Sequence, residues 1–433
     1  MRTVKKYPFS LTESSKTRFL NWAQQFEEVI WLDSNNYSQK HETYQAILAV
    51  DAFTALKTDY HKAFDNLKEY QAITADWIFG YLTYDLKNDV ERLHSNNFDG
   101  LGFPDLYFFQ PKKLFLFSEN NVEVHYLNMV ADEIEEDWTA IFETKDKFDS
   151  PEISKSLGIH IRTTKDGYIQ KVVEVLEHIK RGDIYEVNIC QEFYCENAAI
   201  NPLETFLQLN KISKPPFSVF LKLNSLFALS ASPERYLKRT GNAVISQPIK
   251  GTAKRFGDKE EDLKMAQQLA KDPKERSENI MITDLVRNDL SRIAEKGSVV
   301  VDELCKIYTF EQVHQMISTI SCSVPPNFSS VEILRNTYPM GSMTGAPKIS
   351  AMQIIEETED AKRGLYSGAI GYFSPLGDFD FNVVIRSILY NASKEYVSFS
   401  VGSAITINSI PEKEYEECLL KAKAMREVLN ATL

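Results

Sequence analysis

The sequence predicts an α+β fold, with strands gathered in hairpins and helices that stand apart from them in the chain. Residues 217–223 and 226–231 are two apolar-rich runs, and the dipeptide Asn224-Ser225 between them is typical of a β-hairpin turn. Apolar residues recur at helical spacing elsewhere, first over residues 164–181. Because strands and helices do not alternate regularly, the pattern favours α+β over a doubly wound parallel sheet.

The other elements follow from local signals of the same kind. The first helix has a glycine, Gly182, at its end as a cap. Gly297 ends a second helical stretch, and Pro411 suits the first turn of a long amphipathic helix. The remaining predicted elements are helices over residues 276–296, 349–362 and 411–429, and strand-like runs over residues 378–390 and 396–400.

Composition and charge exclude several classes of protein. The chain has 433 residues, of which 43% are hydrophobic and 25% charged, as in ordinary globular proteins. Its net charge of −12 argues against nucleic-acid binding, which needs a basic face. The sequence contains no run of about 18 apolar residues, so we expect no membrane span. The five cysteines include no Cys-x-x-Cys pair, so we expect neither structural zinc nor disulfides, and we expect a cytoplasmic location.

A polar stretch over residues 143–155 is the best candidate for a boundary within the chain. We therefore expect an N-terminal region over residues 1–150 and a second region over residues 151–433. The motifs that suggest chemistry lie in the second region.

Lys250 stands in the element Pro248-Ile249-Lys250-Gly251-Thr252, after the strand-like residues 243–245. Pro248 fixes the approach of the chain, and Gly251 leaves the backbone free to turn. A lysine on such a stiff support can act as a nucleophile once its amine is deprotonated. The alternative is a hairpin lysine that extends to solvent, which is the usual case for a lysine.

Two helical segments each carry a pair of glutamates at i, i+3 spacing. One pair is Glu275 and Glu278, and the other is Glu414 and Glu417, with Lys421 four residues further on. This spacing places each pair on one helix face. Carboxylates brought together from two helices would suit Mg²⁺, although solvated surface charge gives the same pattern.

Two short motifs are candidates for acid catalysis and for anion binding. Glu234, in Ser232-Pro233-Glu234-Arg235 after an apolar strand, could act as a general acid if its pKa is raised, or could form a surface ion pair with Arg235. The glycine-rich stretch at residues 341–348, which contains Thr344, lacks the Walker A pattern but could bind an anion before a helix. Gly402-Ser403-Ala404 is a similar, weaker case.

Three single residues complete the candidates. His314 is a lone histidine, a residue that is more often structural than catalytic. Arg386 lies in an apolar, strand-like run, where a guanidinium needs an anionic partner, either from the protein or from a ligand. Tyr366 precedes it and could belong either to the core or to the lining of a site.

Taken together, these segments resemble the chorismate-utilising enzymes. This family includes the large subunits of anthranilate synthase and aminodeoxychorismate synthase, isochorismate synthase and salicylate synthase. The resemblance covers the chain from about residue 164 to its C-terminus, and the N-terminal third matches loosely. The matching stretches are residues 232–235, 248–252, 278–289, 341–348, 363–371 and 402–404.

The resemblance implies a fold and a set of roles. The fold would be two large antiparallel β-sheets packed as a sandwich with helices outside, and residues 1–150 would join the same sandwich. Glu278 and Glu417 would hold Mg²⁺, supported by Glu275 and Glu414. The implied catalytic residues are Lys250, Glu234 as the acid for the C4 hydroxyl of chorismate, and His314. The implied contacts to substrate carboxylates are Tyr366, Arg386, Lys421 and residues 402–404.

Lys250 separates members of the family. Anthranilate synthases resemble Pro-Ile-Ala-Gly-Thr at this place, whereas aminodeoxychorismate synthases resemble Pro-Ile-Lys-Gly-Thr, as in this chain. The lysine implies attack on C2 of chorismate, followed by addition of ammonia at C4, on the route to 4-aminobenzoate and folate. Glu186 departs from the family pattern, because many such synthases carry glutamine there and the water-using members carry lysine.

The resemblance also implies partners and leaves alternatives. No glutamine amidotransferase segment is visible, so ammonia would come from a separate glutaminase subunit or from solution. Trp31-Leu32-Asp33-Ser34 resembles an element that contacts regulatory tryptophan in some members, which makes Asp33 and Ser34 candidates for such a site. The alternatives are the large subunit of anthranilate synthase and a non-catalytic protein that binds chorismate or tryptophan.

Overall fold

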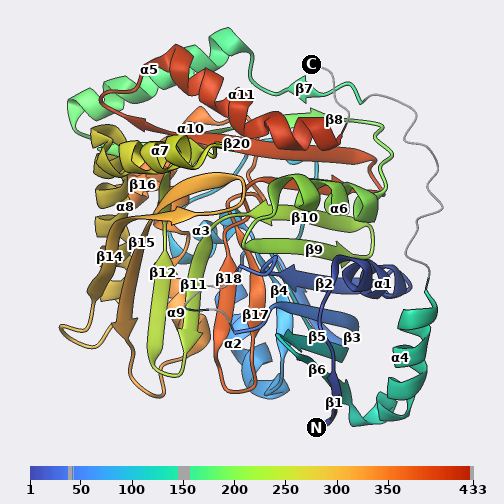
Figure 1. The fold of residues 1–433 in the computed structure, drawn as a ribbon. Coiled ribbons are helices and arrows are strands. Elements are labelled where there is room, and N and C mark those ends of the chain that lie inside the picture. The colour runs from blue at the N-terminus through green and yellow to red at the C-terminus, as the bar shows by residue number, and fades with distance from the viewer. Residues whose placement is uncertain (38–40, 42, 145–156, 430–433) are drawn as a thin grey trace.

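The structure, a computed structural model, describes all residues except 38–40, 42, 145–156 and 430–433 (Figure 1). Its strands form one hydrogen-bonded sheet with two branches that meet at the long strand β5, Leu106–Ser118. All pairings between the named strands are antiparallel. In Figure 1 one branch runs across the view and the other runs up and down.

The first branch contains strands from both ends of the chain. In order from one edge, it consists of β1 (Arg2–Pro8), β6 (Asn121–Leu127), β5, β3 (Ala46–Thr58), β2 (Glu28–Asp33), β9 (Phe217–Leu223), β10 (Leu226–Ser232), β19 (Ser387–Asn391), β20 (Tyr396–Thr406) and β8 (Glu186–Cys195), with the short strands β7 (His160–Ile161) and β16 (Gly345–Ala346) on β8.

The second branch begins on the edge of β5 opposite β3, where residues 106–109 pair with β4 and residues 113–118 pair with β6. Its order is β4 (Ile78–Leu82), β17 (Ala369–Phe373), β18 (Phe379–Asn382), β11 (Arg235–Thr240), β12 (Ala243–Gln247) and β15 (Val313–Ser323), and β15 also pairs with β13 (Ile249–Lys254) and β14 (Val300–Thr309).

The two branches pack against each other around one hydrophobic core. Ile30 and Leu221 of the first branch and Phe79, Leu237 and Phe381 of the second belong to the same buried cluster. This is the sandwich that the sequence implied. Residues 1–150 contribute strands to both branches, because β2 pairs with β9 and β4 pairs with β17. The boundary expected at residue 150 lies outside the described residues.

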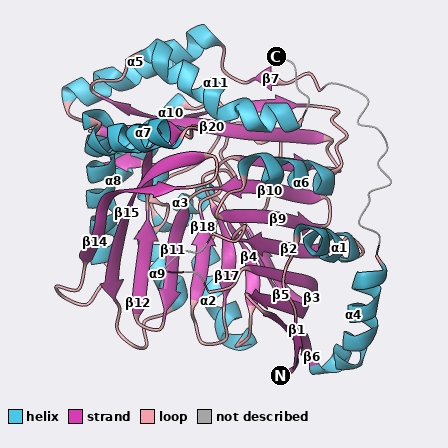
Figure 2. Ribbon diagram, viewed as in Figure 1, coloured by secondary structure: helices cyan, strands magenta, loops and turns pink. Residues whose placement is uncertain are grey.

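Helices cover the outer face of the first branch, and others pack against strands of the second (Figure 2). A second hydrophobic cluster lies between the first branch and the helices that cover it. These helices are α1 (Glu13–Ala23), α4 (Ile134–Glu143), α5 (Lys165–Arg181), α6 (Pro202–Ser213), α10 (Lys348–Thr358) and α11 (Pro411–Val428). The others are α2 (Ala63–Thr74), α3 (Lys87–Val90), α7 (Lys259–Lys271), α8 (Pro273–Ser291) and α9 (Ser330–Thr337). No described helix is long and apolar enough to cross a membrane.

Most predicted elements are confirmed, and three need correction. The helix predicted over residues 349–362 is α10, which ends at Thr358. The hairpin β9–β10 and helix α5 lie where the sequence placed them, and the side chain of Thr164 caps α5. Helix α8 ends at Ser291 rather than near residue 296. The run predicted as one strand over residues 378–390 is two strands, β18 and β19, interrupted at residues 383–386.

Gly80 in β4 allows the two branches to join closely. A Cβ atom at this position would clash with the carbonyl oxygen of Tyr107 and would lie 2.7 Å from the Cα atom of Phe108. Both atoms belong to β5, which pairs with β4 in register. A side chain at residue 80 would therefore push apart the strands that connect the two branches.

We predict that Gly80→Ala lowers the free energy of unfolding by about 2 kcal/mol or more, because the backbone must shift to admit the methyl group. Gly257→Ala is the matched control, because no atom lies within 4 Å of a Cβ at that position. The midpoint of thermal unfolding measures both variants. Equal midpoints for the two variants would contradict the prediction.

Candidate active site

A cavity of about 610 Å³ lies where β13, helices α8 and α11, and the end of β20 converge. Its lining contains the cationic side chains of Lys250, Lys254, Lys274, Arg386 and Lys421. The same wall carries five glutamates, Glu234, Glu275, Glu278, Glu414 and Glu417. Most of the candidate residues from the sequence, though distant along the chain, therefore face one space.

Lys250 enters this cavity from a β-bulge. Ile249 pairs with Ile317 and Thr252 pairs with Gln315, so Lys250 and Gly251 together oppose the single residue Met316. Gly251 has a φ of 91°, a left-handed conformation that glycine adopts without steric cost. A bulge of this kind redirects a side chain relative to the regular strand.

Helix α8 holds the bulge from behind. The side-chain amide of the buried residue Asn279 donates to the carbonyl oxygens of Lys250, at 3.4 Å, and Met316, at 3.1 Å. The hydroxyl of Ser318 donates to the other end of the same amide, at 2.5 Å. The backbone that carries Lys250 is thus fixed on both sides of the bulge.

The amine of Lys250 is surrounded by carboxylates. Its Nζ atom lies 3.4 Å from Oε1 of Glu186, and the Lys250 side chain is only 13% exposed. Burial lowers the pKa of this amine, but the nearby charges of Glu186, Glu278 and Glu234 outweigh burial and raise the pKa above its ordinary value. In the free protein, the amine is therefore protonated at neutral pH.

Glu234 has the property that a general acid needs. It follows β10, it is 5% exposed, and it lines the cavity. Burial raises its pKa to about 7, even though a hydrogen bond from Ser342 and the charge of Lys250 both lower it. An acid whose pKa is near the working pH can donate a proton and then take it back.

The predicted metal ligands fit a cation only in part. Glu278 and Glu275 face the cavity from α8, and Oε1 of Glu278 makes no hydrogen bond to a described residue, its nearest cation being Lys274 at 3.7 Å. Burial raises the pKa of Glu278 to about 7. No three acidic, histidine or cysteine side chains among the described residues lie close enough to form a ready-made metal centre. A cation here would need ligands from the substrate or from water.

Glu417 and Glu414 on α11 differ in their environment. Burial alone would raise the pKa of Glu417, but Lys421, at 2.7 Å, together with Lys274 and Lys250, lowers it. Glu414 is 3% exposed and accepts a hydrogen bond from the hydroxyl of Ser403. Glu417 is thus an ionised cavity carboxylate, whereas Glu414 is tied to β20 and supports the wall.

Arg386 is the clearest sign of an anionic ligand. It lies in the break between β18 and β19 with a φ of 53°, a strained conformation for a residue with a side chain. Its guanidinium lines the cavity and forms no ion pair with a described residue, and burial lowers its pKa. Such a group is costly to hold without a partner, so a bound carboxylate would satisfy it.

Other predicted contacts divide into two groups. Tyr366, Gly402, Ala404 and Lys421 line the cavity, and Nζ of Lys421 donates to the carbonyl oxygen of Gly402 at 2.8 Å. Ser403 and Thr344 do not line it. The hydroxyl of Thr344 donates to the carbonyl oxygens of Met340 and Gly341, so this residue shapes the loop instead of meeting a ligand.

His314 is not brought to the cavity, and its expected catalytic place is corrected. Along β15 side chains alternate between faces, and Val313 and Gln315 are the residues that face the cavity. His314 points the other way, where its ring contacts Asp262 and Thr309, at 3.0 Å each. Gln315 was missed by sequence reasoning, although the two-residue period of a strand would have placed it opposite His314.

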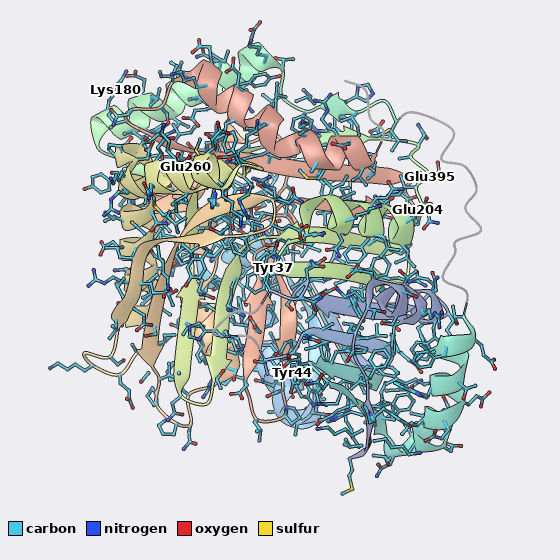
Figure 3. The ribbon with its side chains drawn as sticks, in the orientation of Figure 1. Tyr37, Tyr44, Lys180, Glu204, Glu260 and Glu395 are labelled. Atoms are coloured by element: carbon cyan, nitrogen blue, oxygen red, sulfur yellow. The ribbon has the colours of Figure 1, made fainter. Side chains whose placement is uncertain are left out.

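Asp33 and Ser34 lie at a second, smaller cavity of about 80 Å³ between the two branches. Tyr37 and Tyr44, labelled in Figure 3, also line it. The carboxylate of Asp33 is 2.8 Å from Nζ of Lys16 and accepts a hydrogen bond from the backbone of Asn35. Asp33 and Ser34 therefore share one cavity, which is separate from the larger cavity at Lys250.

The family described as chorismate binding enzyme matches residues 7–427, nearly the whole chain. The chain belongs to this family. Anthranilate synthase component I from Streptococcus pneumoniae has the same fold, with a TM-score of 0.77 at 24% identity over 90% of this chain and 95% of that one. The predicted fold is thereby confirmed.

Several relatives within the chorismate binding family are similar to this chain. Aminodeoxychorismate synthase component 1 of Bacillus subtilis is 31% identical over 81% of this chain and 76% of its own length. Its counterpart in Escherichia coli is 40% identical over 62% of this chain and 58% of its own length, less than two thirds of that relative. Anthranilate synthase component 1 of Thermus thermophilus is 32% identical over 82% of this chain and 77% of its own length.

The raised pKa of Glu234 predicts a contribution to stability that is lost as pH rises. The carboxyl binds its proton more tightly in the folded protein, so this stability is complete below its ordinary pKa of 4.5 and disappears as pH rises to about 7. Within that window we expect wild type to lose about 1.4 kcal/mol per pH unit relative to Glu234→Gln. Chemical denaturation across the pH range measures the difference. Parallel curves for the two proteins would show that Glu234 titrates normally.

Proposed function

We propose that the protein is the large subunit of an aminodeoxychorismate synthase, which converts chorismate and ammonia to 4-amino-4-deoxychorismate. The observation that carries the proposal is Lys250, which the bulge places in a cavity that also contains Glu234. The relatives alone include both aminodeoxychorismate and anthranilate synthases at similar identity. In the motif that anthranilate synthases resemble, alanine occupies the position of Lys250. The lysine therefore favours aminodeoxychorismate synthase activity.

The cavity residues account for each part of the reaction. Arg386 and Tyr366 would hold the carboxylate of the enolpyruvyl side chain, and Lys421 the ring carboxylate. Nζ of Lys250 attacks C2, the C4–O bond breaks, and Glu234 gives its proton to the departing hydroxyl, which leaves as water. Ammonia then forms a bond to C4, the C2–N bond breaks, and its electron pair returns to the lysine.

A divalent cation is part of the proposal. Glu278 and Glu417 would hold Mg²⁺, with Glu275 behind them, and the cation would supply positive charge against the ring carboxylate. Oε1 of Glu278 accepts no hydrogen bond from a described residue, which supports this assignment. Glu414, which is tied to Ser403, would position the helix that carries Glu417.

The proposal includes a source of ammonia and a place of action. The word "component" in the relatives' names supports a separate glutamine amidotransferase subunit as the source of ammonia. All five cysteines are free and buried, which supports a reducing compartment such as the cytoplasm. We also propose that the smaller cavity at Asp33 and Ser34 takes an amino acid such as tryptophan.

The first test is the product. Purified protein with chorismate, Mg²⁺ and an ammonium salt is expected to yield 4-amino-4-deoxychorismate, identified by mass and by conversion to 4-aminobenzoate with an added lyase. Omission of ammonium is the control and should abolish the product. Formation of anthranilate would assign the chain to the alternative activity, and binding without turnover would indicate a regulatory protein.

The second test is the covalent step. We expect Lys250→Ala to abolish most formation of 4-amino-4-deoxychorismate, because no other amine replaces the nucleophile, while binding of chorismate changes little. Lys254→Ala is the matched control, since that lysine lines the same cavity without a proposed role in bond formation. Steady-state rates and calorimetric binding measure both. An unchanged rate for Lys250→Ala would remove the covalent mechanism.

A further inference from the structure

Glu186 contacts Lys250 from outside the cavity. It is the first residue of β8, it is 2% exposed, and it is absent from the residues that line the cavity. Its Oε1 atom lies 3.4 Å from Nζ of Lys250. Among the described residues this is the one carboxylate within ion-pair distance of that amine. Glu186 therefore acts on the cavity through neighbouring groups, mainly through Lys250, while its charge also raises the pKa of Glu278.

The backbone of Glu186 is fixed on two sides. It pairs with Thr406 of β20 and with Ala346 of β16. Its second carboxylate oxygen, Oε2, has no hydrogen-bond partner among the residues that the structure describes. Protonation of this carboxyl would therefore cost no hydrogen bond at Oε2, and the strand holds it in place while Lys250 changes state.

The proposed reaction requires a proton acceptor for the amine of Lys250, and the other charged groups nearby have different roles. Lys250 is protonated in the free protein, and a protonated amine has no electron pair with which to attack carbon. The groups that face it from neighbouring elements are Glu234 after β10, Glu275 and Glu278 on α8, and Glu417 on α11. Glu234 must keep its own proton for the leaving hydroxyl, and the α8 and α11 carboxylates are assigned to the cation.

We propose that Glu186 is a positioning residue that holds the amine of Lys250 in place and accepts its proton as the amine attacks. This inference rests on the proposed function. In the step, one N–H bond of Lys250 breaks and an O–H bond forms on Glu186. The freed electron pair makes the N–C2 bond, the C4–O bond breaks, and the hydroxyl takes its proton from Glu234. When ammonia bonds to C4, the C2–N bond breaks and the lysine leaves as a neutral amine, to which Glu186 returns the proton. The new ammonium group at C4 gives one proton to Glu234, which restores both carboxyl groups to their starting states.

Glu186→Gln keeps the shape of the side chain and removes its ability to take a proton. At saturating Mg²⁺ and ammonium we expect kcat to fall roughly 100-fold near neutral pH, with KM for chorismate little changed. Below pH 7, where Glu234 is still protonated, the rate of the variant should rise about tenfold per pH unit, because its amine must first lose a proton to water. Wild type should be nearly flat over the same range.

Two further variants separate this role from a structural one. Glu186→Asp keeps a carboxylate and should restore the flat pH profile at a reduced rate. Glu192→Gln is the matched control, because Glu192 is buried on the same strand but pairs with Arg162 and Tyr396. It should keep the wild-type profile. A flat profile for Glu186→Gln at the wild-type rate would overturn the proposal.

A measurement without turnover distinguishes this inference from the proposed function. Lys250 in the wild type and in Glu186→Gln is labelled with an amine-selective acylating reagent over a series of pH values, and the labelled peptide is quantified by mass spectrometry. Because the variant loses the ion pair, its Lys250 should react at a lower pH than that of wild type. Identical labelling curves would refute the contact. Failure of wild type to form 4-amino-4-deoxychorismate, with shifted labelling curves, would refute only the proposed function.

Discussion

The geometry of the larger cavity depends on a β-bulge, one extra residue in the pairing of β13 with β15. Without the bulge at Lys250 and Gly251, strand β13 would keep a two-residue period along β15, and the lysine could not take its present direction. The bulge in turn requires a glycine at a left-handed position and a buried asparagine, Asn279, to accommodate its carbonyl groups. A local irregularity of the backbone thus sets the position of the Lys250 amine, and the surrounding strands hold the bulge in place.

Many of the charged groups in the cavity compensate one another. Lys421 compensates Glu417 at 2.7 Å, Glu186 compensates Lys250, and Ser403 satisfies Glu414. Among the described residues, Arg386 forms no ion pair, and Oε1 of Glu278 has no hydrogen-bond partner. Because unsatisfied buried charge is expensive, these two groups mark where a ligand supplies what the protein lacks.

The sequence predicted the fold class and the hairpin at residues 217–231, and most of the candidate residues that it named line the cavity. These succeeded because helix caps, strand periodicity and short motifs are local signals. His314, expected at the site, does not line the cavity, because a motif names a residue without stating which face of a strand it occupies. The single strand expected over residues 378–390 failed for a similar reason, since apolar composition conceals the left-handed break at Arg386. The ion pair of Lys250 with Glu186 depends on residues 64 positions apart (250 − 186), which no local pattern links.

The way β2 pairs with β9, and β4 with β17, has a consequence for any shortened form of this chain. A fragment that began after residue 156 would retain every residue proposed for chemistry. It would also present two open strand edges, one along β9 and one along β17, each with a row of unpaired backbone groups. Exposed edges of this kind recruit strands from other chains and lead to aggregation. The N-terminal strands therefore cover the two strand edges that residues 157–433 would otherwise expose.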